Sequence, residues 1–157
     1  MNPVRLGIIG MGNIGRYHAG YVRAGKVPRC VLTAVCPRLP ATLDGRSVAV
    51  YDDAGEMIRS GAVDAVLIAT PHGQHPALGR AAFEAGLHVL VEKPIAAHKA
   101  DAERFIAAHQ RHSECVFAVM HQFRVEPRYQ KMRALIRDGA LGTLVRVNWI
   151  NTDWFRP

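Results

Sequence analysis

The amino-acid sequence predicts an α/β fold in which helices cover both faces of a doubly wound parallel sheet. Two observations support this prediction. Short apolar runs alternate with amphipathic stretches of helical length, which is the pattern of repeated β-α-β units. Most of these runs are apolar at nearly every position, as strands that are buried on both faces require.

The predicted strands follow one another along the first three quarters of the chain. They occupy residues 4–9, 30–36, 48–50, 63–69, 88–91 and 116–120. Between them, residues 14–22, 78–85 and 105–109 carry apolar side chains at helical spacing. Only residues 37–47 join the second and third strands, and because this segment contains prolines and a glycine, an irregular loop is predicted there.

The composition excludes several classes of protein. Of the 157 residues, 49% are apolar and 21% are charged, which is the balance of a globular protein with one buried core. No apolar run approaches the roughly 18 residues that cross a bilayer, and no signal-peptide pattern is present, so a cytoplasmic protein without membrane contact is expected. Cys30, Cys36 and Cys115 form no C-x-x-C pair, so buried thiols and no metal site are expected.

The net charge of +7 raises the question of a nucleic-acid partner. Most basic residues are scattered along the chain, and a solvated helix face is the favoured interpretation of the densest group. No nucleic-acid binding is therefore expected. That group consists of Arg124, Arg128, Lys131, Arg133 and Arg137.

A glycine-rich turn joins the first predicted strand to the first predicted helix. Gly10, Gly12 and Gly15 form a G-x-G-x-x-G motif that encloses Asn13 and Ile14. In a Rossmann-type domain the first glycine permits the tight turn, the second admits a pyrophosphate, and the third lets the helix pack against the strand. The start of the helix adds unpaired N–H groups and a partial positive charge. This context favours a dinucleotide site over an ordinary glycine-rich turn.

The end of the second predicted strand departs from the common dinucleotide-binding pattern. An acidic residue usually stands there and accepts hydrogen bonds from the adenosine ribose. Here the strand is followed by Pro37 and Arg38. Because a guanidinium can bind a 2′-phosphate through two hydrogen bonds, NADP is expected to be tolerated or preferred beside NAD. The alternative is that Arg38 is a solvated loop residue.

Polar residues follow the fourth and fifth predicted strands. In an open parallel sheet, ligands lie beyond the carboxyl ends of the strands, at the point where the strand order reverses. Both loops should therefore converge beside Gly12. The residues concerned are Thr70, Pro71 and His75 after the fourth strand, and Glu92, Lys93 and Pro94 after the fifth.

With these motifs in this order, the sequence resembles the Gfo/Idh/MocA family of oxidoreductases. The family combines a glycine-rich turn with a Thr-Pro-x-x-x-His loop and a Glu-Lys-Pro segment. The resemblance continues through Arg124 and Pro127, then through residues 139–142, and extends to Trp154, Phe155 and Arg156. It covers nearly the whole chain, and the combination is far more specific than any single motif.

The resemblance implies reversible hydride transfer between a nicotinamide cofactor and a carbinol carbon of a sugar, an inositol or a related polyol. Lys93 is then the catalytic residue, whose ammonium stabilises developing alkoxide charge or relays a proton. Glu92 is expected to line the nicotinamide pocket, and Pro94 to follow a cis peptide bond that directs Lys93 inward.

The same resemblance assigns the remaining site residues. Thr70, Pro71 and His75 are expected to line the cofactor channel, and Arg124 to contact the substrate. The catalytic Asp and His that family members commonly carry in a second domain have no match in this sequence. The chain alone is therefore expected to be inactive.

Two domains are predicted: a dinucleotide-binding domain over residues 1–122, and the start of a truncated second α/β domain over residues 123–157. Residues 128–138 are predicted to be a helix, and the alternating pattern of residues 143–150 predicts a strand. A full-length form is expected to form homo-oligomers through the sheet that this strand would begin. The alternative to an enzyme is a non-catalytic dinucleotide-binding module that acts as a sensor or a partner subunit.

Overall fold

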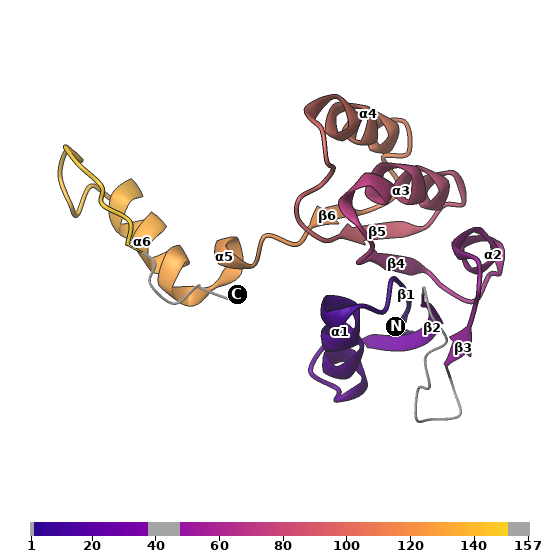
Figure 1. Ribbon diagram of the computed structural model, residues 1–157. Helices are drawn as coiled ribbons and strands as arrows, with labels where there is room; N and C mark the ends of the chain where they lie inside the picture. Colours follow the sequence, from indigo (N-terminus) through magenta and orange to yellow (C-terminus); the bar gives the residue numbers. More distant parts are fainter. Residues whose placement is uncertain (1, 38–47, 151–157) are drawn as a thin grey trace. The chain divides into compact units, whose positions relative to one another are not determined.

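The computed structural model describes residues 2–37 and 48–150 (Figure 1). The chain divides into two compact units, Met1–Met120 and His121–Pro157, and each is described by itself. Arg38, Trp154, Phe155 and Arg156 lie outside the described residues.

The first unit is built on a parallel sheet whose described strands have the order β3-β2-β1-β4-β5-β6. The order reverses between β1 and β4, as in a Rossmann-type domain, so the predicted fold class is confirmed. The strands are β1 (Val4–Ile9), β2 (Cys30–Cys36), β3 (Ala49–Val50), β4 (Ala65–Ile68), β5 (His88–Val91) and β6 (Phe117–Val119). Three of them match the predicted bounds, and β3, β4 and β6 are shorter than predicted.

Helices cover both faces of this sheet. The helix α1 (Asn13–Arg23) packs on one face, over a core cluster that includes Ile8, Leu32 and Val35. The other face is covered by α2 (Ala54–Arg59), α3 (His75–Glu84) and α4 (Lys99–Gln110), with a short 3₁₀ turn, η1 (His72–Gln74), before α3. No described helix has both the length and the apolar character that crossing a membrane requires.

The buried face of α1 consists of small residues. Gly15, Ala19 and Val22 are buried, whereas Tyr17 and Tyr21 are 59% and 42% exposed, with tilted rings in contact. The spacing of apolar residues over 14–22 therefore predicts the helix. The face that packs on the sheet is the one that carries the smaller side chains, Gly15, Ala19 and Val22. A close approach of α1 to β1 and β2 is the result.

The core under α3 and α4 is aromatic. Phe83, Phe105 and Phe117 pack against one another with ring centroids 4.7–5.7 Å apart. A Cβ on Gly79 of α3 would collide with the ring of Phe105 on α4. Gly79 thus allows the two helices to pack closely, and the aromatic cluster holds β5 and β6 in the sheet.

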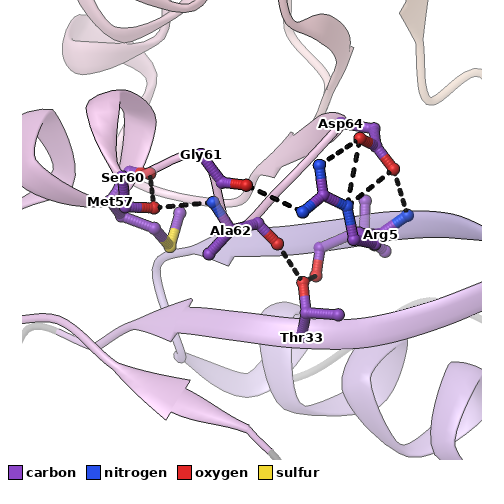
Figure 2. A network of polar contacts seen from close by, with 8 residues as sticks. Arg5, Thr33, Met57, Ser60, Gly61, Ala62 and Asp64 are labelled. Carbon is purple, nitrogen blue, oxygen red and sulfur yellow. Dashed lines mark hydrogen bonds and ion pairs between the residues drawn. The ribbon is translucent and has the colours of Figure 1, made fainter.

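A polar network ties β1 to the loop that precedes β4 at the amino end of both strands (Figure 2). The Arg5 guanidinium donates to Asp64 Oδ1 at 2.6 Å and to the Gly61 carbonyl at 2.7 Å, and the Arg5 backbone N–H donates to Asp64 Oδ2. The Thr33 hydroxyl of β2 donates to the Ala62 carbonyl at 2.9 Å. This network fixes the loop against two strands.

The second unit contains α5 (Gln122–Val125) and α6 (Pro127–Arg137). The predicted strand over residues 143–150 is wrong, because this segment has no regular secondary structure. A strand is stabilised by ladder hydrogen bonds to a neighbour, and the described residues of this unit provide no neighbouring strand. Its apolar side chains are consequently exposed, among them Val145 at 93%, while Trp149 stacks on Tyr129 of α6.

Candidate functional site

A crevice of about 1220 Å³ lies in the first unit, beyond the carboxyl ends of β1, β2 and β4. Its walls come from four places in the sequence: the glycine-rich turn, the end of β2, the segment between β3 and α2, and the loop from β4 into α3. This is the position at which the strand order reverses, where open parallel sheets bind their ligands.

The three glycines of the turn have different steric surroundings. Gly10 has a φ of +94°, and a Cβ there would lie 2.6 Å from the Ala69 carbonyl oxygen. A Cβ on Gly15 would collide with the Gly10 carbonyl oxygen. A Cβ on Gly12 would meet nothing within 4 Å. The fold therefore requires Gly10 and Gly15, whereas Gly12 leaves open space at the crevice.

The start of α1 has backbone donors directed at this space. Gly12 is the N-cap residue and provides no side-chain cap, so the first N–H groups of the helix keep their capacity to bind an anion. Asn13 and Ile14 are exposed and line the crevice. Arg16 folds back from α1 and donates to the Met11 carbonyl at 3.0 Å, which holds the turn in place.

Thr70 and Pro71 follow β4 in a loop that borders the glycine-rich turn, and both residues line the crevice. The hydroxyl oxygen of Thr70 is buried and has no hydrogen-bond partner among the described residues. Buried hydroxyls are nearly always paired, so an orphan in a crevice wall fits a site that a polar ligand completes. The residues of the turn and of this loop therefore fit a dinucleotide.

His75 lies beneath this wall and does not line the crevice. Its ring is fully buried, with Nδ1 3.1 Å from the Pro94 carbonyl oxygen and Nε2 2.9 Å from the Thr70 carbonyl oxygen. Both carbonyls can only accept, and a neutral ring carries one N–H, so the tautomer determines which of the two carbonyls accepts the hydrogen bond. His75 thus joins the loop after β4 to the loop after β5.

Glu92 and Lys93 follow β5 at the same edge of the sheet. Glu92 is buried, and its Oε1 lies 2.7 Å from Nε2 of His18 on α1. Its second carboxylate oxygen accepts the backbone N–H of Lys93 at 3.2 Å. The peptide bond between Lys93 and Pro94 is cis, as predicted, but the Lys93 side chain is exposed and is not among the residues that line the crevice. The carboxylate of Glu92 therefore connects the first helix to the Lys93 backbone.

Of the predicted residues of the first unit that the structure describes, those around the site lie at one edge of the sheet, where Lys93 is exposed outside the crevice lining and the others fall into two groups. The glycine-rich turn, Thr70 and Pro71 line the crevice, whereas His75 and Glu92 are buried behind its walls. Arg124 is exposed in α5 of the second unit. No group of three or more potential metal ligands is assembled in residues 2–37 and 48–150.

Two polar residues at this edge were not predicted from the sequence. His18 binds a partner 74 positions away, so no local pattern identifies it. Asp52 follows β3 and lines the crevice beside Pro37. The one feature of the sequence that could have pointed to Asp52 is that no carboxylate directly follows β2, where a ribose-binding acidic residue usually stands.

These features define a Rossmann-type dinucleotide-binding domain. More particularly, the chain belongs to the Gfo/Idh/MocA family, whose model, described as an oxidoreductase family with an NAD-binding Rossmann fold, matches residues 4–139.

Comparison with individual related proteins supports this assignment. The chain is 32% identical to inositol 2-dehydrogenase 1 of Saccharopolyspora erythraea, over 96% of this chain and 46% of the relative. It is also 32% identical to the rhizopine catabolism protein MocA of Rhizobium meliloti, over 100% of this chain and 50% of the relative. The chain therefore spans about half the length of the curated relatives it matches.

Among solved structures, the scyllo-inositol dehydrogenase from Lactobacillus casei is similar, with a TM-score of 0.84 and 29% sequence identity. The match covers 90% of this chain and 43% of that protein, which was crystallised with bound NAD(H) and scyllo-inositol. The myo-inositol 2-dehydrogenase from Lactobacillus plantarum has a TM-score of 0.79 at 25% identity, over 92% of this chain and 44% of that protein.

Proposed function

We propose that this chain is the cofactor-binding half of an NAD(P)-dependent oxidoreductase that acts on a sugar, an inositol or a related polyol. The observation that carries the proposal is the crevice where the strand order reverses. Its glycine-rich turn leads into a helix start without a side-chain cap, and the Thr70 hydroxyl in the neighbouring loop has no partner in the part of the chain that the structure describes. The inositol dehydrogenases among the relatives support the choice of a polyol substrate.

In this proposal the backbone of residues 12–14 holds the pyrophosphate of the dinucleotide. Thr70 and Pro71 contact the cofactor from the loop that borders the glycine-rich turn, and the cofactor provides a partner for the Thr70 hydroxyl. When bound, the nicotinamide supplies the atom that accepts or donates a hydride. The role of Arg38 toward a 2′-phosphate stays a prediction from the sequence.

Lys93 is the proposed catalytic residue. In its uncharged form its amine would accept the proton of the substrate hydroxyl as hydride leaves the carbinol carbon for the nicotinamide, and the ammonium so formed would stabilise charge on the oxygen. Glu92 and His18 would position Lys93, because the carboxylate of Glu92 accepts the Lys93 backbone N–H and lies within hydrogen-bonding distance of His18. His75 would keep the two loops of the site together.

The substrate contact of Arg124 and the formation of homo-oligomers through a carboxyl-terminal sheet are proposals for a full-length form. The competing proposal is a dinucleotide-binding module without turnover. Retention of Lys93 favours the enzyme. The two proposals differ in whether a full-length form oxidises a polyol.

The test measures NADH binding and turnover over a panel of inositols and sugars in a full-length form. Lys93→Met should lower turnover by about 100-fold or more while NADH binding persists, because a general acid or base is lost. The matched control is Lys99→Met, which removes an equal charge from the exposed face of α4. Unchanged turnover in Lys93→Met would reject the role of Lys93, and binding without turnover in the unaltered protein would leave only the module.

A further inference from the structure

The crevice wall beside β2 carries a carboxylate that comes from a neighbouring strand. Pro37 occupies the position after β2 where the ribose-binding acidic residue usually stands. In the parallel ladder, Val35 of β2 pairs with Val50 of β3, and the Tyr51 N–H donates to the Val35 carbonyl at 2.9 Å. Asp52 follows Val50 by two positions, as Pro37 follows Val35, so this register continued beyond the strands places the two residues at the same end of the ladder. Both residues line the crevice.

The electrostatics of Cys36 support this placement. Burial raises the pKa of the Cys36 thiol, and the carboxylates of Asp53 and Asp52 raise it further. Both negative charges therefore act at the carboxyl end of β2. Of the two, Asp53 serves the fold, because its Oδ1 accepts the Glu56 N–H at 2.8 Å and caps α2. Asp52 is exposed and faces the crevice.

We propose that Asp52 is a specificity-determining residue that makes the crevice favour NAD over NADP. The inference rests on the proposed dinucleotide binding. A carboxylate at the adenosine end accepts hydrogen bonds from ribose hydroxyls, and it repels a 2′-phosphate that carries nearly two negative charges. Asp52, which follows β3, thus takes the role of the acidic residue that is absent after β2. Its effect on cofactor choice opposes the NADP preference expected from Arg38.

The experiment compares dissociation constants of NADH and NADPH by fluorescence titration of the 157-residue chain at low ionic strength. The unaltered chain should bind NADH about tenfold more tightly than NADPH, and added salt should narrow this ratio. Asp52→Asn should reduce the ratio by about tenfold, chiefly by strengthening NADPH binding. Asp52→Ser provides a second variant with the same expectation.

Asp53→Asn is the matched control, because it removes an equal charge one residue away and keeps a side chain that caps a helix. It should change the ratio by less than about threefold. Tighter NADPH binding by the unaltered chain would overturn the inference and leave dinucleotide binding intact, as would equal effects of Asp52→Asn and Asp53→Asn. Failure of both nucleotides to bind the unaltered chain would overturn the inference together with the proposed function.

Discussion

At the edge of the sheet where β1 and β4 begin, the polar side chains of Arg5, Thr33 and Asp64 are all hydrogen-bonded within the protein (Figure 2). At the edge where the same two strands end, the buried Thr70 hydroxyl has no partner within residues 2–37 and 48–150, and the first N–H groups of α1 lack a side-chain cap. The two edges share strands, and the carboxyl edge differs because some of its polar groups have no partner among the described residues, although Glu92 and His75 are hydrogen-bonded there.

This difference separates two tasks. Satisfied polar groups at the amino edge contribute to folding and offer little to a ligand. At the carboxyl edge, the exposed N–H groups at the start of α1 keep the capacity to bind an anion, and a dinucleotide that binds the folded chain would raise its stability. Substitutions at the carboxyl edge should therefore affect binding, folding or both, according to what each residue contacts, whereas substitutions at the amino edge should affect folding alone.

The largest effect is expected from Gly10→Ala. Its Cβ would lie 2.6 Å from the Ala69 carbonyl oxygen in a backbone conformation with φ of +94°, so the turn must distort. The free energy of unfolding should fall by about 2–4 kcal/mol, measured by urea denaturation.

Gly12→Ala is the matched variant within the same turn. A Cβ there meets nothing within 4 Å, so the unfolding free energy should stay nearly unchanged. NADH should nevertheless bind about tenfold more weakly or worse, because the added methyl group separates the pyrophosphate from the backbone. Equal losses of stability in the two variants would contradict the division of roles between these glycines.

A smaller effect is expected from His18→Ala, which leaves the buried carboxylate of Glu92 without its partner on α1. The free energy of unfolding should fall by about 1–3 kcal/mol. The double variant His18→Ala with Glu92→Gln should recover part of this loss, because the uncompensated charge is removed. An additive double variant would show that the two side chains do not interact.

Much of this architecture could be predicted from the sequence, because strands buried on both faces are apolar throughout. Residues 4–9, 30–36 and 88–91 follow that pattern, and their predicted bounds match β1, β2 and β5. The glycine-rich turn was equally recognisable, since its positive φ at Gly10 and its close contact at Gly15 can be met only by glycine.

The rest depends on contacts between residues that are distant in the sequence. The pairing of His18 with Glu92 and the placement of Asp52 beside Pro37 exist only once the strands are in register. The predicted strand at residues 143–150 failed for a related reason. Its alternating pattern is typical of a strand, but a strand also needs a neighbouring strand to pair with, and the described residues of the second unit provide none.

The smallest effect is expected at the amino edge, from Asp64→Asn. Hydrogen bonds from the Arg5 side chain and backbone lower the pKa of the Asp64 carboxyl, so its ionised form stabilises the fold. This contribution is fully present above the pKa of an unfolded aspartate, about 3.9, and is lost as the pH falls through the lower folded value. At pH 7, Asp64→Asn should have a slightly lower Tm than the unaltered chain, and this difference should shrink toward zero at acid pH.

Asp101→Asn is the control for that comparison. Asp101 makes an exposed ion pair with Arg104 on the same helix, so its loss disconnects no distant segments and should change the Tm less at pH 7. NADH affinity should be unaltered in both variants, because neither residue lines the crevice. A fall in NADH affinity in Asp64→Asn would mean that the two edges of the sheet are coupled, and that folding and binding are not divided between them.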